Sequence, residues 1–262
     1  MGLFNIFKKQ DCEICGKEVG MFGYKKLKDG EICKDCVKLL SPWFEDRKES
    51  TVAQIKEQLA YRARNAEDLK SFNPTKAYGD FEYMYVEERD GVPYRFCVSR
   101  DKDYLKENAD LVLVEDVEEV IIDIDDNAHE HREDEEDPDD VTYDLDYRFS
   151  VSLMIKNNPY FDNIHFDLNY RGVEVSGVRS RYEDIMDVED EEDAEFRQLY
   201  EEVYPVFVAN YRKYKTMCDE IEAMVNNPGA PVQETASAPK FCPNCGAPAE
   251  GGKFCQSCGS KL

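Results

Sequence analysis

Apolar and polar residues alternate with a period of two through the middle of the chain, a pattern typical of half-buried β-strands. The clearest run extends from Tyr143 to Ile155, where every second residue is apolar. The turn sequence Asn157-Asn158-Pro159 follows it. A second alternating run, from Ile164 to Tyr170, is expected to return antiparallel to the first.

Further strands are predicted upstream of this pair. Residues 81–86 alternate between aromatic and other side chains, and Asp90-Gly91 is a hairpin signal before Tyr94–Val98. Leu111–Val114 and Val117–Ile124 are two more apolar runs. Together these runs predict an antiparallel meander of six or seven strands with one buried face.

Helical spacing is found on both sides of the predicted strands. Between Thr51 and Lys70, apolar residues recur every three or four positions, and Ser50 or Thr51 is available as the N-cap. The apolar positions of this helix are Val52, Ile55, Leu59 and Ala63.

A second helical region extends from Asp187 to Met224, first acidic and then amphipathic. Pro205 is expected to kink or split it. Its apolar stripe consists of Phe196, Leu199, Val203, Phe207, Tyr211, Tyr214, Cys218, Ile221 and Val225. A twisted antiparallel sheet closed by a C-terminal helix resembles a pleckstrin-homology-like (PH-like) barrel. We therefore expect an α+β protein with a central antiparallel PH-like β-barrel.

Eight of the ten cysteines form four C-x2-C pairs, two near each end of the chain. Four thiolates from two such pairs are the preferred tetrahedral shell of structural Zn²⁺, and this shell has no open position for water or substrate. Two structural zinc ions are therefore expected. The predicted ligands are Cys12, Cys15, Cys33 and Cys36 for the first ion, and Cys242, Cys245, Cys255 and Cys258 for the second.

The two cysteine modules differ in the sequence between their pairs. In the first, a turn at Gly30 separates two short strands, and Cys33–Leu40 reads as the start of a helix that stops before Pro42. This order of a knuckle, a hairpin and a helix start is treble-clef-like. The second module has no helical pattern and is expected to be a small zinc ribbon of two knuckles.

Disulfide bonds are the alternative reading of eight paired cysteines. Disulfide frameworks are typical of secreted chains, and the first ten residues do not resemble a signal peptide. We therefore favour zinc and a cytoplasmic location. The two remaining cysteines, Cys97 and Cys218, are expected to be buried as small apolar residues.

The cysteine motifs also resemble known families. The run from Cys12 to Cys36, with C-x-I-C-G-K-E and K-L-K-D-G-x-I-C-K-D-C, is similar to a small zinc-binding domain of unknown function, DUF4428, found at the N-termini of many bacterial proteins. The C-terminal F-C-P-N-C-G-A and K-F-C-Q-S-C-G resemble the double zinc ribbons common at bacterial protein ends. Both resemblances imply zinc binding and no particular activity.

These patterns divide the chain into five predicted parts. Residues 1–42 form the first zinc module, residues 43–72 a connecting helix, and residues 73–225 the acidic β domain with its C-terminal helix. Residues 226–239 are rich in proline and alanine and are expected to be a flexible tether for the ribbon of residues 240–262.

The negative charge of the chain, −24 in total, is concentrated in the β domain. Residues 71–195 contain 12 basic and 38 acidic side chains, whereas residues 1–70 contain 14 and 12. We expect a domain with this excess of negative charge to repel nucleic-acid phosphates and anionic membranes. No apolar run is long enough to span a membrane.

No motif of a known catalytic class is found. Residues 123–134 superficially resemble a calcium loop, but Ala128 and Asp134 stand where that loop needs glycine and glutamate. A solvated acidic loop between strands is the expected structure there. His129 and His131 are weak candidates for a divalent ion, and His165 is expected on the outer face of its strand.

Three function classes remain open on this sequence. The favoured one is a non-enzymatic zinc-binding adaptor or regulatory protein that binds another protein through the PH-like body and the tethered ribbon. The alternative is association with nucleic acid through the ribbon, which has three lysines and two phenylalanines available for contact. The third is an enzyme without a recognisable motif, and no general acid or base is assigned.

Overall fold

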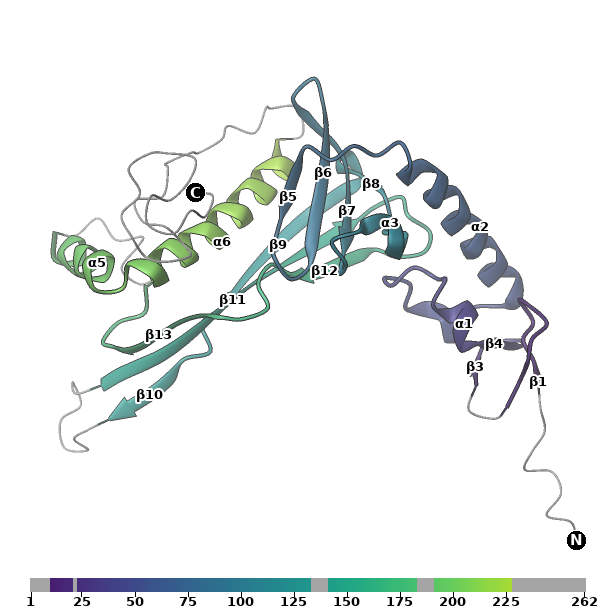
Figure 1. The fold of residues 1–262 in the computed structure, drawn as a ribbon, viewed down its shortest axis with the longest axis horizontal. Helices are drawn as coiled ribbons and strands as arrows, with labels where there is room; N and C mark the ends of the chain where they lie inside the picture. The colour runs from purple at the N-terminus through teal and green to yellow at the C-terminus, as the bar shows by residue number, and fades with distance from the viewer. Residues whose placement is uncertain (1–9, 21–22, 133–140, 183–190, 228–262) are drawn as a thin grey trace, which may run out of the picture. The chain divides into compact units, whose positions relative to one another are not determined.

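A computed structural model of the chain describes residues 10–20, 23–132, 141–182 and 191–227 (Figure 1). The chain divides into two compact units that alternate along the sequence. Unit 1 contains Met1–Ala77, Tyr83–Val120 and Ser152–His165. Unit 2 contains Tyr78–Glu82, Ile121–Val151 and Phe166–Leu262.

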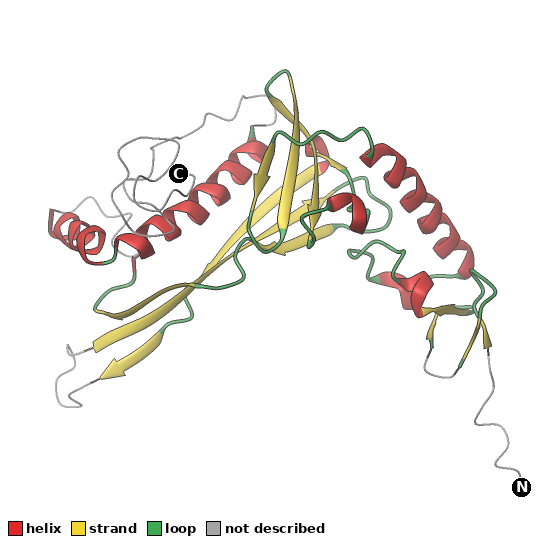
Figure 2. Cartoon of the chain, viewed as in Figure 1, coloured by secondary structure: helices red, strands yellow, loops and turns green. Residues whose placement is uncertain are grey.

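Unit 1 begins with the first cysteine module, which is built from two antiparallel strand pairs and a short helix (Figure 2). Gly16 has a φ of +70° after the second cysteine, a conformation that glycine adopts without steric cost. The elements are β1 (Gln10–Asp11), β2 (Glu18–Val19), β3 (Tyr24–Lys26), β4 (Glu31–Cys33) and α1 (Lys34–Val37). The predicted hairpin and helix start are confirmed.

Helix α2 (Val52–Leu69) follows a short 3₁₀ turn at Asp46–Lys48. It begins where the sequence predicted, because Thr51 and Gln54 form a capping box in which each side chain accepts a hydrogen bond from the backbone N–H of the other residue. The buried face differs from the predicted apolar one: Ala63 is exposed, and Ile55 is the only predicted apolar position that is fully buried. The buried residues of the helix are Ile55, Gln58, Arg62, Asn65 and Leu69.

Four short strands follow α2 and form one antiparallel sheet in the order β5-β6-β7-β8. Asp90 and Gly91 both have positive φ in the turn between β6 and β7, which confirms the predicted hairpin. The bounds are β5 (Lys76–Tyr78), β6 (Tyr83–Arg89), β7 (Val92–Ser99) and β8 (Val112–Leu113), with helix α3 (Tyr104–Glu107) between β7 and β8.

The second sheet is organised around one long strand, β11 (Val141–Ile155). The predicted alternation is confirmed from Leu145 onward, where every second side chain is buried. The other strands of this sheet are β9 (Val117–Asp125), β10 (His129–Arg132), β12 (Asn163–Asp167) and β13 (Val173–Val178), and each pairs with β11.

Although this sheet has five described strands, it is only three strands wide at any point along β11. β10 pairs with residues 141–144 of β11, and further along the chain Lys156 donates a backbone hydrogen bond to Asp116, just before β9. β9 and β10 therefore follow each other along one edge of β11. On the other edge, β13 pairs with residues 143–147, and Leu168, just past β12, donates its backbone N–H to Phe149.

The predicted PH-like barrel is therefore wrong for the part of the chain that the structure describes. The strands there form open antiparallel sheets, and no closed barrel is present. A sheet that is three strands wide is too narrow to curl back on itself. The α+β class and the antiparallel pairing are confirmed.

Unit 2 also contains the helices α5 (Glu191–Val203) and α6 (Pro205–Asn226). Pro205 lies in the first turn of α6, so the predicted split is confirmed. Helix α6 packs on β11 through aromatic rings: the centroid of Tyr211 is 5.0 Å from that of Tyr147, and the centroid of Tyr214 is 5.5 Å from that of Phe149. No helix among the described residues is both long and apolar enough to cross a membrane.

The apolar stripe predicted for this region is only partly buried. On α6 the stripe faces inward, whereas Leu199 and Val203 on α5 are 52% and 54% exposed. The break at Pro205 interrupts the helical register, and among residues 197–203 of α5 it is Tyr200 that is buried. The predicted ribbon of residues 240–262 and nearly all of the predicted tether, from residue 228 on, lie outside the described residues.

Candidate metal centre

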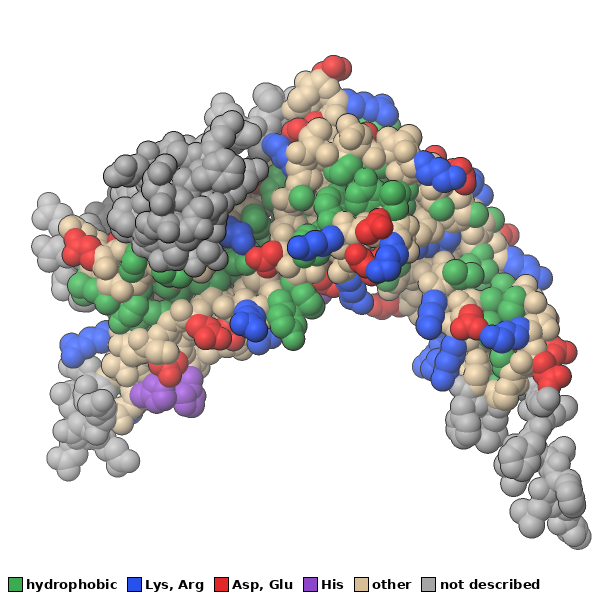
Figure 3. Space-filling model, viewed as in Figure 1, with side chains coloured by type: hydrophobic (Ala, Val, Ile, Leu, Met, Phe, Trp, Pro, Cys, Tyr) green, Lys and Arg blue, Asp and Glu red, His purple; other side chains and the backbone are tan. Residues whose placement is uncertain are grey.

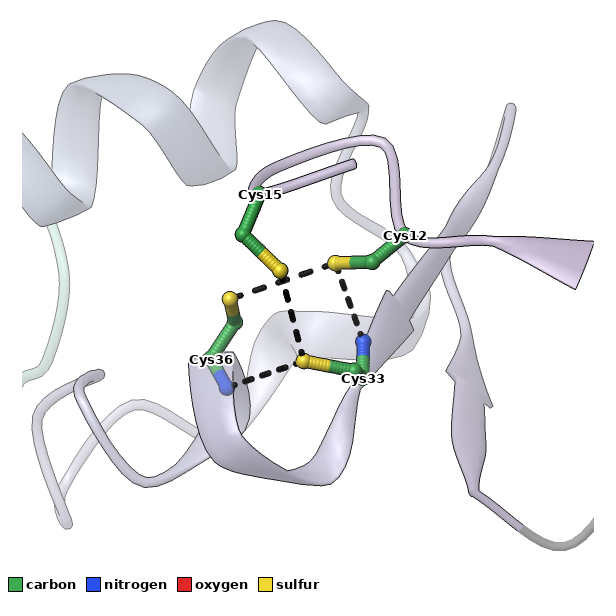
Figure 4. A group of neighbouring side chains, drawn as sticks. All are labelled: Cys12, Cys15, Cys33 and Cys36. Carbon is green, nitrogen blue, oxygen red and sulfur yellow. Dashed lines mark hydrogen bonds between the residues drawn. The ribbon is translucent and has the colours of Figure 1, made fainter. Parts of the chain in front are cut away.

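The four N-terminal cysteines converge from one turn and from the junction of a strand with a helix (Figure 4). Cys12 follows β1, and Cys15 lies in the turn before β2. Cys33 ends β4 and is also the N-cap of α1, and Cys36 lies within α1. The sulfurs of Cys33 and Cys36 therefore face those of Cys12 and Cys15.

The distances between the sulfurs fit a tetrahedral metal site. The Sγ atoms of Cys12 and Cys36 are 3.9 Å apart, and those of Cys15 and Cys33 are 3.8 Å apart. All four sulfurs lie within 4.8 Å of one another. A Zn–S bond of about 2.3 Å implies an S–S edge of roughly 3.8 Å in a regular tetrahedron. The four cysteines therefore form a cluster that can hold one Zn²⁺.

Backbone N–H groups point at the sulfurs, as thiolate ligands require. Cys33 donates its N–H to Cys12 Sγ at 3.2 Å, and Cys36 donates its N–H to Cys33 Sγ at 3.4 Å. Burial alone would raise the pKa of Cys12, but backbone hydrogen bonds from Cys33, Cys15 and Ile14 outweigh it and lower the pKa to about 6. This environment favours the thiolate form that binds metal.

Burial and the neighbouring thiols raise the pKa of Cys36. A metal ion would supply the positive charge that favours the thiolate at this position. The donor set thus fits Zn²⁺. Because all four ligands come from the protein, such an ion has no position for a substrate and acts on stability rather than on chemistry.

Residues 10–58 match the family model of a domain of unknown function, DUF4428. No curated protein matches the chain, and no solved structure matches it. The matched region contains all four clustered cysteines and the first turns of α2.

The part of α2 that lies within the matched residues packs on the cysteine module. Ile55 on α2 is fully buried in one cluster with Leu27, Ile32 and Leu40. The turn between β3 and β4 also reaches the start of the helix, where Asp29 Oδ1 accepts the backbone N–H of Val52 at 2.7 Å. The metal cluster and the N-terminal half of α2 therefore share one core.

The other predicted ligands, Cys242, Cys245, Cys255 and Cys258, lie outside the described residues. Among the described residues, the N-terminal cysteines are the only group with a donor arrangement for a metal ion. Cys97 and Cys218 are free and buried, as predicted. Burial raises the pKa of both thiols, that of Cys218 to about 12.

The histidines of the acidic segment lie on a strand. His129 and His131 belong to β10, so the expectation of a loop there is wrong, and the segment is largely strand up to Arg132. Figure 3 shows histidine side chains as an exposed patch. His131 Nε2 lies 2.9 Å from Asp144 Oδ2 on β11, and this contact lowers the pKa of the Asp144 carboxyl. On β12, His165 is exposed, as predicted, and its Nδ1 lies 2.9 Å from Ser152 Oγ.

A buried polar cluster in unit 1 was not predicted from the sequence. Arg62 Nη1 donates to Asp110 Oδ1 at 2.6 Å, and Ser41 Oγ donates to Asp110 Oδ2 at 2.7 Å. Asn65 adds hydrogen bonds to the backbone of Ala109 and Leu111. This cluster joins the loop after α1, the middle of α2 and the segment after α3. The only sequence signal for it is the set of polar residues at helical spacing on α2.

Proposed function

We propose that the DUF4428 region is a structural zinc module and that the chain is a non-enzymatic adaptor that binds another protein. The closed four-cysteine cluster is the observation that carries the first part, because its geometry matches a zinc shell without an open position. Zinc-bound thiolates suit a reducing compartment, and a cytoplasmic location is part of the proposal.

The adaptor role is supported by a groove in unit 2. It has a volume of about 890 Å³ and lies between β13 and the junction of α5 with α6. Val203 and Val206 line it and are 54% and 41% exposed. Exposed apolar side chains that gather beside a concave surface are typical of protein-binding sites.

Strand β13 gives the groove a backbone edge. Among the described strands β13 pairs only with β11, so its other edge carries no strand. Residues 171–176, which include the first part of β13, line the groove. An extended peptide from a partner protein can add to such an edge through backbone hydrogen bonds, while its apolar side chains contact Val203 and Val206.

Affinity capture with nuclease-treated lysate tests this role. We expect the full-length chain to retain a specific protein, and we expect Val203→Glu and Val206→Glu to lose it. Leu105→Glu is the matched control, because Leu105 is 52% exposed and lies on α3 in unit 1. Cross-linking followed by mass spectrometry should place the partner peptide beside residues 171–176.

Three results would contradict the proposal. Capture that disappears with nuclease treatment would favour the nucleic-acid alternative. If the valine variants capture the partner as well as the wild type does, the groove is not the binding site. Turnover of a small substrate that is lost on one carboxylate substitution would identify an enzyme.

A further inference from the structure

A cavity of about 500 Å³ lies within unit 1, and it shares no lining residue with the metal cluster or with the groove of unit 2. Its walls come from the end of α1 and the loop that follows, from Arg62 on α2, and from the segments 98–100 and 106–109. The volume falls in the range of small-molecule sites, roughly 300–1,000 Å³.

The charge of this cavity is opposite to that of the chain. The whole sequence has 33 basic and 57 acidic residues, whereas the cavity is lined by five basic residues and one acidic residue. The basic residues are Lys38, Arg47, Arg62, Arg100 and Lys106, and the acidic one is Glu107.

Two of these basic residues form ion pairs with acidic residues. Arg62 is paired with Asp110, and Lys106 is paired with Asp101. The Glu107 carboxylate is also engaged, because its Oε2 accepts hydrogen bonds from Ser99 Oγ and from the backbone N–H of Arg100, both at 2.8 Å.

Two further cations approach the cavity from the loop side. Arg47 Nη1 donates to the backbone carbonyl of Lys26 at 2.6 Å, a neutral acceptor that fixes the side chain without cancelling its charge. Lys38 is exposed directly after α1. Together they give the cavity a positive side within an acidic protein.

The remaining walls are apolar or aromatic. Leu40 and Val98 are buried, and Trp43 and Phe44 are half-buried at the cavity. A neighbouring cavity of about 620 Å³ shares Trp43 and Arg100 with the first, but three acidic residues line it, namely Glu45, Asp46 and Asp162. The first cavity therefore has an excess of basic residues beside its aromatic wall, whereas acidic residues outnumber the one arginine in the second.

We propose that this cavity binds a small organic anion, a phosphate or carboxylate group attached to a flat apolar group. Lys38 and Arg47 bind the acid group through charge-assisted hydrogen bonds. Trp43 and Phe44 pack against the apolar part. This site goes beyond the adaptor role and does not depend on it.

The single tryptophan of the chain, Trp43, reports on this cavity by its fluorescence. The full-length, zinc-loaded protein is titrated at constant ionic strength with phenyl phosphate, benzoate, inorganic phosphate and benzylammonium. We expect a saturable change with phenyl phosphate or benzoate, and the tighter of the two identifies the acid group. Inorganic phosphate should bind at least about tenfold more weakly, because it lacks the apolar part. Benzylammonium should not bind.

Two variants and a control tie the signal to the cavity. Arg47→Gln and Lys38→Gln should each weaken binding of the better anion by roughly five- to tenfold, since each removes a charged donor. Arg64→Gln is the matched control, because Arg64 is exposed on α2 and does not line the cavity. Lys38→Gln tests an exposed side chain, so it remains informative if Arg47→Gln unfolds the loop.

The proposal is overturned if neither aromatic anion gives a saturable signal or if benzylammonium binds as well as they do. It is equally overturned if folded Lys38→Gln binds like the wild type, or if Arg64→Gln weakens binding as much as Lys38→Gln. Thermal melting curves establish which variants are folded.

Discussion

The Arg62 guanidinium donates to the Asp110 carboxylate at 2.6 Å, with side chains only 5% and 0% exposed. The pair joins α2 to the segment after α3 within unit 1. Burial raises the pKa of Asp110, whereas Arg62 and Ser41 act to lower it. A buried pair of this kind holds elements in register, because neither charge tolerates the loss of its partner.

Asp110→Asn should therefore destabilise unit 1 strongly. The substitution leaves the Arg62 charge buried without a counter-ion, at an expected cost of about 3–5 kcal/mol. Urea denaturation of the full chain measures this change in the free energy of unfolding. Asp68→Asn is the control, because Asp68 is exposed on α2. A loss below about 1 kcal/mol for Asp110→Asn would show that the pair contributes little.

Replacing both members of the pair should restore most of the lost stability. Arg62→Met combined with Asp110→Leu removes both buried charges at once, and apolar substitutes for buried ion pairs are often neutral or stabilising. We expect the double variant to be more stable than Asp110→Asn in the same denaturation experiment. A double variant less stable than the single one would mean that the hydrogen bonds to Ser41 and Leu39 matter more than the charges.

Gly30 has no space for a side chain. A Cβ at this position would lie 2.7 Å from Val52 Cγ2 and 3.0 Å from Glu13 Cγ, so Gly30→Ala should push the β3–β4 turn away from α2. We expect a loss of about 1–3 kcal/mol, typical of overpacking. Gly20→Ala is the matched control, since a Cβ there would meet no atom within 4 Å. Equal melting temperatures for the two variants would contradict the packing of α2 on the module.

Metal removal should unfold the DUF4428 region before the β11 sheet. The module has a small core around Ile32 and Ile55, and such modules depend on their metal for folding. β11 has an independent aromatic core with α6. Hydrogen exchange with and without chelator should show loss of protection over residues 10–58 and retained protection over residues 145–155. Parallel loss in both regions would mean that the zinc supports the whole chain.

Secondary structure was predictable wherever burial is one-sided. The alternation from Leu145 to Ile155 and the helical stripe from Phe207 to Ile221 each follow from apolar side chains that face a single core. Capping residues and proline predicted where helices begin or break, as at Thr51 and at Pro205. These signals depend only on neighbouring residues, so the sequence contains them in full.

Pairing partners and buried polar contacts were not predictable. Alternation identifies a strand but does not reveal that β9 and β10 share one edge of β11, which is why the barrel prediction was wrong. The burial of Arg62 and Asn65 has no local signal in the sequence, because their partners Asp110 and Ala109 lie more than 40 residues further along the chain. Spacing alone did identify the four cysteines of the metal cluster, since a C-x2-C turn is a local feature.

Metal content tests the central claim most directly, namely that Cys12, Cys15, Cys33 and Cys36 hold one structural Zn²⁺. Native mass spectrometry and elemental analysis of the full-length protein should find two zinc ions, one for each predicted module. The double variant Cys12→Ser, Cys15→Ser should retain one, and the control Cys97→Ala should retain two, because Cys97 lies in a different core cluster. Equal zinc content in the wild type and the double variant, or disulfides in place of metal, would contradict the account.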